Sequence, residues 1–273
     1  MSFLKKLQII VLDISKLANN TFRFSGFQPI RGKFIQPSKN DKPWEFTEFQ
    51  HNAQYILKPF SIVYVVGYFP KYKEPFIENF MVESSRNFYH IGNLKRNQCS
   101  DFLEMISRRD IQNIYGEKVI QNKYYLEGTV RRSLGMLRVK QVNSFIYCRN
   151  QKKQKDEYRL SFMDNTNEEY NSIQIIDLNL RTYCNYLHYK CRESYEKISG
   201  NLLDFLQKKK IYLQLCLSNP VVNTENEHGR MFLQVSGIYT FPNYLKGKTF
   251  IDFSGIRTFV KNHDDFKQNN HDL

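Results

Sequence analysis

The sequence has 273 residues, 40 basic and 27 acidic side chains, a formal charge of +13, and a hydrophobic fraction of 41%. This composition excludes an intrinsically disordered chain, and the length allows one large domain or two small ones. No apolar run reaches the roughly 18 residues that a membrane-spanning helix needs, so no membrane partner is expected.

The first segment, residues 2–18, is predicted to be a helix that docks on the body of the chain or on a partner. Its apolar residues recur on one helical face, although residues 7–12 alone would also suit a strand. Residues 19–59 contain four prolines and are predicted to be irregular, with a short strand at 31–36. Trp44 is expected to anchor a small core.

The middle of the chain has apolar segments bounded by turn residues, which predicts strands at residues 60–69, 76–83 and 87–94. A helix is predicted over residues 100–115, because Ser100 or Asp101 can cap its start and Gly116 can end it. Two basic strands follow around Gly135, at residues 123–132 and 136–148.

The C-terminal half contains the clearest pattern, a long hairpin over residues 210–218 and 230–241 in which apolar residues recur at every second position. Strands at 158–163 and 172–178 and a helix at 194–208 precede it. Residues 181–193 are rich in aromatic side chains and fit no element clearly. Residues 243–260 are expected to add a small strand or helix, and residues 261–273 are expected to be a disordered tail.

From residue 123 onward the order is a bent strand, two strands, a helix and a final strand pair. This order is typical of the five-stranded oligonucleotide/oligosaccharide-binding (OB) barrel, with residues 123–148 as a first strand bent at Gly135. The same order also fits residues 60–148. Both frames use residues 123–148, so they cannot both be complete.

The run YRLSFMDNT at residues 158–166 and the runs FLQV at 232–235 and IYTFP at 238–242 resemble OB domains of telomere-end and replication protein A-like complexes. Upstream, VVG at residues 65–67 and YLEGTVR at 125–131 are similar to small OB subunits of telomere-capping complexes. The resemblance implies a mainly β fold with helices, of the α+β class. It implies a β-rich unit at residues 1–116, compatible with a partial OB fold, an OB domain at 117–243 and a C-terminal extension at 244–273.

The resemblance also implies a function. The chain would be a non-enzymatic accessory subunit of a telomerase, telomere-end or single-stranded-DNA-handling complex in the nucleus. Its main role would be assembly with other protein subunits, with DNA or RNA as a further partner. Two alternatives stay open, a structural subunit of a large ribonucleoprotein such as an organellar ribosome and a pure protein scaffold. Glu225 and Glu227 in the loop at 219–229 favour a protein partner.

The positive charge is concentrated in residues 117–155, which hold ten basic and two acidic side chains, a local net charge of +8. A basic groove with aromatic rings between the cations is the arrangement by which OB barrels hold single strands. The alternative to base stacking is that these rings fill the interior of the barrel. The predicted nucleic-acid-binding residues are Tyr124, Arg131, Arg132, Arg138, Lys140, Phe145, Tyr147, Arg149, Lys152 and Lys153.

Cofactor and catalytic signatures are missing from the sequence, which has neither a GxxxxGKS/T nor a GxGxxG loop and no HExxH pattern. No cofactor and no enzyme activity are therefore predicted. Cys184, His188 and Cys191 offer three possible zinc ligands where a structural site needs four, so buried thiols are preferred to a metal. The odd number of cysteines, five, indicates free thiols in a reducing compartment. A mitochondrial location is the alternative to the nucleus, although Asp13 and the lack of arginine in residues 1–20 disfavour a transit peptide.

Overall fold

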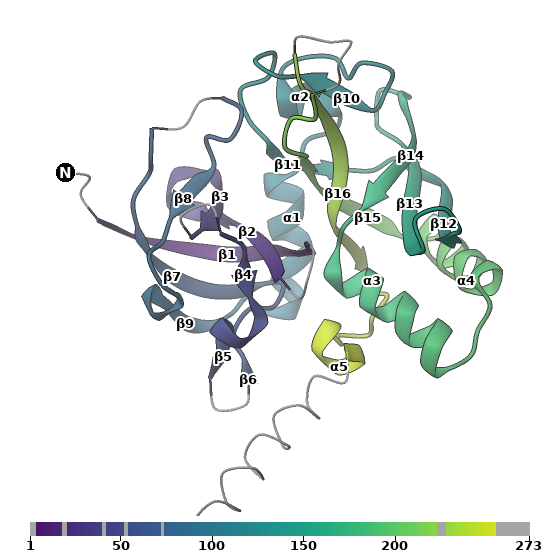
Figure 1. Cartoon of the computed structure of the whole chain (residues 1–273), viewed down its shortest axis with the longest axis horizontal. Coiled ribbons are helices and arrows are strands. Elements are labelled where there is room, and N and C mark those ends of the chain that lie inside the picture. The colour runs from purple at the N-terminus through teal and green to yellow at the C-terminus, as the bar shows by residue number, and fades with distance from the viewer. Residues whose placement is uncertain are drawn as a thin grey trace, which may run out of the picture.

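A computed structural model of the chain describes residues 4–17, 21–39, 42–51, 54–71, 74–222 and 228–254. Two seven-stranded sheets dominate the described part, and each curls upon itself. The N-terminal sheet and the C-terminal sheet lie side by side, with the helix α1 (Cys99–Ile106) between them (Figure 1). Each sheet encloses its own apolar core.

The C-terminal sheet closes into a barrel through one bent strand. Its strands are β10 (Tyr124–Leu126), β11 (Leu134–Arg138), β12 (Gln141–Asn150), β13 (Lys155–Met163), β14 (Glu169–Ile175), β15 (Lys210–Leu217) and β16 (Arg230–Phe241). β11 pairs with β15, and β12 pairs with β13. At the bend between β11 and β12, the Val139 amide donates to the Ile211 carbonyl at 3.1 Å. The next amide, that of Lys140, donates to the Met163 carbonyl at 3.0 Å, which joins both edges of the sheet.

The remaining pairings identify the fold. β13 pairs with β14, β14 runs parallel to β16, and β16 pairs with β15. Counting β11 and β12 as one strand, the order around the barrel is one-two-three-five-four. All contacts are antiparallel except that between the third and fifth strands. This is the topology of the OB fold, and the mainly β, α+β class predicted from the sequence is confirmed.

The N-terminal sheet repeats this topology. Its strands are β1 (Lys5–Lys16), β2 (Thr21–Gln28), β3 (Lys33–Ser38), β4 (Trp44–Glu45), β7 (Ser61–Gly67), β8 (Asn79–Met81) and β9 (Phe88–Asn93). β1 pairs with β2 and β7, β2 pairs with β3, and β3 runs parallel to β8. Two hydrogen bonds between Tyr68 and Met81, of 3.0 and 2.8 Å, then join β7 to β8 and close the barrel.

Between the third and fourth strands of this barrel, the described residues form short elements instead of an α-helix. They are the 3-10 turn η2 (Phe46–Phe49) and the small hairpin of β5 (Gln50–His51) and β6 (Gln54–Tyr55). The core prediction for Trp44 is confirmed, since its ring is buried against Phe24, Phe49 and Phe88. The Trp44 indole donates to the Pro37 carbonyl at 3.0 Å, which satisfies its one polar atom.

In the C-terminal barrel, helices occupy the position between strands β14 and β15. α3 (Leu178–Asn185) continues into the π-helix η5 (Tyr186–Lys190), and α4 (Tyr195–Gln207) follows. The Ser194 hydroxyl accepts the Lys197 amide at 3.2 Å and so caps α4. Ile198, Leu202 and Leu206 on one face of α4 pack into the barrel core. The short helix α5 (Phe250–Ser254) comes after the last strand.

Gly200 lies within α4, and we expect its replacement by alanine to raise the free energy of unfolding by about 0.5 to 1 kcal/mol. A Cβ at this position meets no heavy atom within 4 Å. The alanine therefore restricts the unfolded chain at no packing cost. Urea denaturation followed by circular dichroism measures the change, and a loss of stability would contradict the expectation.

The two barrels share a buried interface. The side chains of β1 that point away from the N-terminal core, Ile10 and Leu12, pack with α1 and with Met136, Tyr212 and Tyr239 of the C-terminal barrel. The Tyr239 hydroxyl donates to the Leu12 carbonyl. The interface also buries the Asp13 and Asp177 carboxyls, which accept hydrogen bonds from Ser25 and from the Ile238 amide, respectively. The barrels therefore form one packed body.

The helix predicted at residues 2–18 is wrong, because most of this segment is β1. Almost every residue from Leu7 to Ser15 is buried. One face of β1 lines the barrel core and the other faces α1 and the second barrel, so no alternation of apolar and polar residues remains to indicate a strand. The region predicted to be irregular at 19–59 also contains the unpredicted strand β2, whereas the short strand predicted at 31–36 corresponds to β3. β1 is consequently an internal element and cannot serve as a docking helix.

Three further predictions need correction. The helix at 100–115 is two helices, α1 and α2 (Ile111–Tyr115), because the backbone of Arg108 bonds to Met136 and Arg138 of β11 and interrupts it. The first strand of the C-terminal barrel begins at Leu134 and bends at residues 139–140, and Gly135 lies within β11 instead of at the bend. The alternative barrel frame over residues 60–148 is wrong, because the N-terminal barrel is built from β1, β2, β3, β7 and β8.

The long hairpin is confirmed as β15 and β16, and the helix at 194–208 is confirmed as α4. The prediction for residues 243–260 is met by α5. The predicted tail at 261–273 and the acidic residues Glu225 and Glu227 lie outside the described residues. Among the described residues, no helix is both long and apolar enough to cross a membrane.

Candidate nucleic-acid interface

The ten residues predicted to bind nucleic acid do not gather on one surface. Phe145 and Tyr147 are buried in the core of the C-terminal barrel, which is the other role considered for them, and they present no ring to a ligand. Arg131 and Arg132 are exposed before β11. Arg132 lines a cleft of about 660 Å³ near the turn between β2 and β3.

Several of the predicted cations are held by neighbours. Arg138 forms an ion pair with Glu104 at 2.7 Å, and Lys210 contacts the same carboxylate at 2.7 Å. Hydrogen bonds from Lys210 and Tyr212 lower the pKa of Glu104 to about 2, so this acid stays charged opposite Arg138. Lys140 bonds to the side chain of Asn167. These contacts leave Arg138 and Lys140 tied to the barrel surface.

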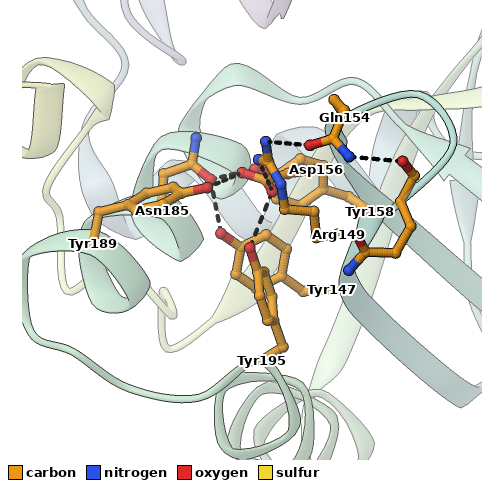
Figure 2. A network of polar contacts seen from close by, with 9 residues as sticks. Tyr147, Arg149, Gln154, Asp156, Tyr158, Asn185, Tyr189 and Tyr195 are labelled. Carbon is orange, nitrogen blue, oxygen red and sulfur yellow. Dashed lines mark hydrogen bonds and ion pairs between the residues drawn. The ribbon is translucent and has the colours of Figure 1, made fainter.

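Arg149 lies near the end of β12, and Lys152 and Lys153 belong to the loop between β12 and β13. A network of polar contacts fixes the base of this loop (Figure 2). Asp156 accepts hydrogen bonds from the hydroxyls of Tyr189 at 2.9 Å and Tyr195 at 3.2 Å. Arg149 pairs with the same carboxylate at 3.4 Å. The network therefore anchors the strands that flank Lys152 and Lys153, whose side chains remain exposed.

The same network extends beneath the loop to Asn185, whose side-chain oxygen accepts the hydroxyls of Tyr147 at 3.0 Å and of Tyr158 (Figure 2). Burial raises the pKa of both tyrosines well above the ordinary value. Both hydroxyls therefore remain donors at every physiological pH. Asn185 ends α3, so hydrogen bonds tie α3, η5 and α4 to the strands β12 and β13 that carry the loop.

A row of polar side chains crosses the outer face of the C-terminal barrel and leads to a second group of cations. Arg159 on β13 lies opposite Gln174 on β14, and Gln174 lies opposite Gln234 on β16. The Gln234 amide donates to Gln174 at 3.1 Å. Arg23, which comes from β2 of the other barrel, donates to the Gln234 oxygen at 3.4 Å and to the Cys216 sulfur at 3.3 Å.

Lys16 and Arg181 extend this row. The end of β1 reaches the second barrel through the Lys16 amide, which donates to the Ile176 carbonyl at 3.2 Å. The Arg181 guanidinium on α3 lies 5.0 Å from the centre of the Tyr158 ring. Partial burial, followed by repulsion from Arg181, lowers the pKa of Lys16. Lys16 and Arg181 therefore lie close enough to repel each other, and neither forms an ion pair among the described residues.

We define the cation face as the five residues Lys16, Arg23, Lys153, Arg159 and Arg181. Lys153, Arg159 and Arg181 line one shallow pocket of about 100 Å³ together with Gln174. Glu157 pairs with Arg159 at 3.2 Å and with Lys153 at 3.7 Å. Within the described part of the chain, however, Lys16, Arg23 and Arg181 form no ion pair. The acid that interacts with Arg23 is Asp13, and burial raises the pKa of Asp13.

The cation face continues along β16 to an aromatic pair. Side chains of a strand alternate between its faces, so Phe232 points to the same side as Gln234. The Phe232 ring is 38% exposed and packs against Tyr124, with 5.8 Å between ring centres. The Arg230 guanidinium lies 4.9 Å from the Tyr124 ring. Of the predicted aromatic residues, Tyr124 alone borders a surface that a nucleobase could approach.

Six residues of this surface were not among the predicted residues, namely Lys16, Arg23, Arg159, Gln174, Arg181 and Gln234. They come from β1, β2, β13, β14, α3 and β16 and form no local charge cluster in the sequence. Only the strand order of two packed barrels brings them together. Arg159 lies in the YRLSFMDNT run and Gln234 in the FLQV run, and these two runs were the signals that pointed to this face.

The cysteines and histidine considered as zinc ligands have other roles. Cys184 is fully buried in the barrel core, and burial raises the pKa of its thiol. The His188 ring bonds through Nδ1 to the Glu193 carbonyl at 2.8 Å. Across the described residues, no group of three His, Cys, Asp or Glu side chains is placed to hold a metal ion.

Neither the protein-family models nor the curated proteins give a match to the sequence. Among solved structures, the crystal structure of the tetrameric p202 HIN2 is similar, at 10% identity and a TM-score of 0.31. The similarity covers 88% of this chain and 94% of that chain. A similarity of this size carries no functional argument, and the OB assignment rests on the strand order described above.

Proposed function

We propose that the chain is a non-enzymatic OB-fold subunit that binds single-stranded nucleic acid across the cation face. The observation that carries the proposal is the set Lys16, Arg23 and Arg181, three cations without an ion pair among the described residues, beside the second, third and fifth strands of an OB barrel. Oligonucleotides bind to OB folds on the face of the second and third strands.

The chemistry of the face suits a single strand. The phosphates of a strand supply negatively charged partners for Lys16 and Arg181, which form no ion pair among the described residues. Lys152 and Lys153 extend this row of cations over the loop between β12 and β13. The side-chain amides of Gln174 and Gln234 can bond to base or sugar groups. Phe232, which packs against the buried Tyr124, offers a ring on which a base can stack. Because most contacts are to phosphate, binding is expected to depend strongly on salt and weakly on sequence.

A salt titration tests the proposal. For the double variant Lys16→Gln/Arg181→Gln, we expect weaker binding of labelled single-stranded DNA. The slope of log K against log salt should fall by about 1.4, because each phosphate that the protein no longer neutralises accounts for about 0.7. Fluorescence anisotropy at several salt concentrations, with DNA and RNA strands of equal length, measures both quantities.

The matched control is Lys118→Gln/Lys208→Gln. Both lysines are exposed, form no ion pair among the described residues and lie outside the cation face. This control removes the same charge and should keep the wild-type slope. Equal slopes for both double variants, or no binding at low salt, would show that the cation face is not a nucleic-acid site.

In its narrower form, the proposal places the chain as an accessory subunit in a telomerase, telomere-end or other single-stranded-DNA-handling complex of the nucleus. It would act there mainly in assembly with other protein subunits. The support for this form is the resemblance of residues 158–166 and 232–242 to OB domains of such complexes. Purification of the tagged chain from nuclear extract, with and without nuclease, tests which subunits accompany it and whether nucleic acid holds them together.

A pure protein scaffold is the second candidate, and the strand β9 favours it. β9 ends the strand order of the N-terminal sheet, so its outer edge is open to another strand. Its side chains Tyr89 and Ile91 are 53% and 50% exposed. Lys6 lies 4.2 Å from the Tyr64 ring and 5.9 Å from the Tyr89 ring on the same face. This candidate predicts no DNA binding at any salt concentration.

A further inference from the structure

A cleft of about 720 Å³ lies between the two barrels and shares no residue with the cation face. Its walls come from β1, the segments before β7 and after β9, the start of α3, the end of β16 and residues 242–249, and they include the buried carboxyls of Asp13 and Asp177. Both barrels contribute to it, so the cleft exists only because they pack together. Its volume is in the range of sites that hold small ligands.

The lining of the cleft combines aromatic rings with three cations and with two carboxyls, Asp13 and Asp177, whose pKa values are raised by burial. Phe60, Tyr239 and Phe241 provide rings, and the ring centres of Phe60 and Tyr239 are 5.3 Å apart. Three cations also line the cleft, namely Lys58, Arg96 and Lys248. Within the described residues none of the three forms an ion pair, so their charge is available to an anion. The side chains of Asn93 and Asn97 add amide groups.

Phe60 has a strained backbone. Its φ is +68°, in the left-handed region that bulky side chains rarely adopt. Two hydrogen bonds hold it there, from the Phe60 amide to the Val11 carbonyl and from the Leu94 amide to the Phe60 carbonyl, both 2.8 Å. A glycine would adopt this conformation without strain, yet the chain has a phenylalanine whose ring lines the cleft. Strain of this kind is concentrated at ligand sites, where it positions a side chain.

We propose that this cleft binds a nucleotide, with the base against the Phe60 ring and the phosphate near Arg96 and Lys248. Aromatic rings stack any base, and amide groups bond to base edges. Aromatic side chains beside cations without ion pairs suit a ligand that has an aromatic group at one end and two negative charges at the other. The ligand can be a free nucleotide or the phosphorylated terminal nucleotide of a strand, because both carry a base and a phosphate monoester.

Calorimetric titration with deoxynucleoside monophosphates tests the proposal on the full chain. We expect a monophosphate to bind at least about tenfold more tightly than the matching nucleoside or inorganic phosphate, since each of these lacks one half of the ligand. The Arg96→Gln/Lys248→Gln variant should bind the monophosphate about tenfold or more weakly. The Lys118→Gln variant should bind it with the wild-type affinity. Both cationic positions are exposed, so these variants do not threaten folding.

Phe60→Gly separates a ligand role from a packing role. Glycine relieves the strained φ while it removes the ring, so binding should fall by about tenfold or more while the chain stays folded by circular dichroism. The Lys16→Gln/Arg181→Gln variant should still bind the monophosphate, and Arg96→Gln/Lys248→Gln should keep the salt slope for DNA. The two proposals can therefore fail independently.

Competition between ligands identifies the source of the nucleotide. A linear single strand that displaces the bound monophosphate, when a circular strand of equal length does not, indicates a strand end. Displacement by neither indicates a free nucleotide. The proposal is overturned if monophosphate does not bind at millimolar concentration, if inorganic phosphate binds as tightly, or if the Phe60 and Arg96/Lys248 variants bind like the wild type.

Discussion

Replacement of Gly67 by alanine is expected to lower the free energy of unfolding by roughly 3 kcal/mol. Gly67 is the last residue of β7, next to the Tyr68–Met81 bonds that close the N-terminal barrel. A Cβ here would overlap the Met81 carbonyl oxygen and would lie 2.8 Å from the Phe80 ring. The carbonyl is backbone and cannot rotate away, so either β7 or β8 must shift and the closing bonds must lengthen.

The loss can be followed through Trp44, which is the one tryptophan of the chain and is buried in the N-terminal barrel. Guanidinium denaturation read by Trp44 fluorescence therefore reports on the barrel that the substitution affects. Gly92→Ala is the matched control, because Gly92 lies in β9 of the same sheet and a Cβ there meets nothing within 4 Å. It should change stability by less than about 0.5 kcal/mol. Equal effects of the two substitutions would contradict the closure argument.

Parts of the C-terminal barrel were predictable because their sequence patterns are regular. In β15 apolar residues recur at every second position, although every residue from Ile211 to Leu217 is buried, and α4 has a capping serine and one apolar face. In the N-terminal barrel, the strands predicted at 31–36, 60–69, 76–83 and 87–94 overlap β3, β7, β8 and β9, but β1 and β2 were missed. Both faces of β1 are buried and both carry aliphatic side chains, such as Ile9 and Ile10, so its sequence has no period of two. The short strand β8, of three residues, gives too little pattern to set its limits.

The cation face could not be predicted from local sequence. The charge-rich segment at 117–155 led to Phe145 and Tyr147, whose alternation on β12 places them inside the barrel, and to Arg138, which Glu104 neutralises. Lys16 and Arg181 carry no local signal, since each is one cation in an otherwise ordinary segment. Their meeting follows from the hydrogen bond between β1 and Ile176, which is a tertiary contact. A sequence pattern indicates which face of a strand is buried. It does not indicate which segment the end of that strand contacts.

Because of Asp177, we expect the free energy of unfolding to fall as the pH rises. Its carboxyl is buried between the barrels and accepts the amides of Asn179 at 2.8 Å, Leu180 at 3.4 Å and Ile238 at 3.0 Å. Burial raises the pKa of Asp177 from 3.8 to about 7, and the three amides, which act to lower this pKa, do not reverse the direction. Between these values the folded chain holds a proton that the unfolded chain has released. The stabilisation is therefore complete below about pH 4 and is lost as the pH rises to about 7, a total of about 4 kcal/mol.

Asp177→Asn isolates this effect. The asparagine oxygen can still accept the Asn179 amide and cap α3, but its NH₂ group faces the Ile238 amide. The variant should therefore be less stable than the wild type at about pH 5, by roughly 1 to 3 kcal/mol. It should then lose less stability than the wild type between about pH 5 and about pH 8, because position 177 no longer titrates. Urea denaturation at several pH values measures both slopes.

The two curves should approach each other as the pH rises, without the variant becoming flat. Burial also raises the pKa of Asp13 and of Glu78, which accepts the Ser133 amide at 3.1 Å, so both contribute a slope of the same sign in either protein. Glu104 acts in the opposite direction, but its lowered pKa confines its effect to more acidic solutions. If the variant and the wild type run parallel from about pH 5 to about pH 8, the Asp177 carboxyl does not titrate between the barrels and the pH dependence of their packing must come from other groups.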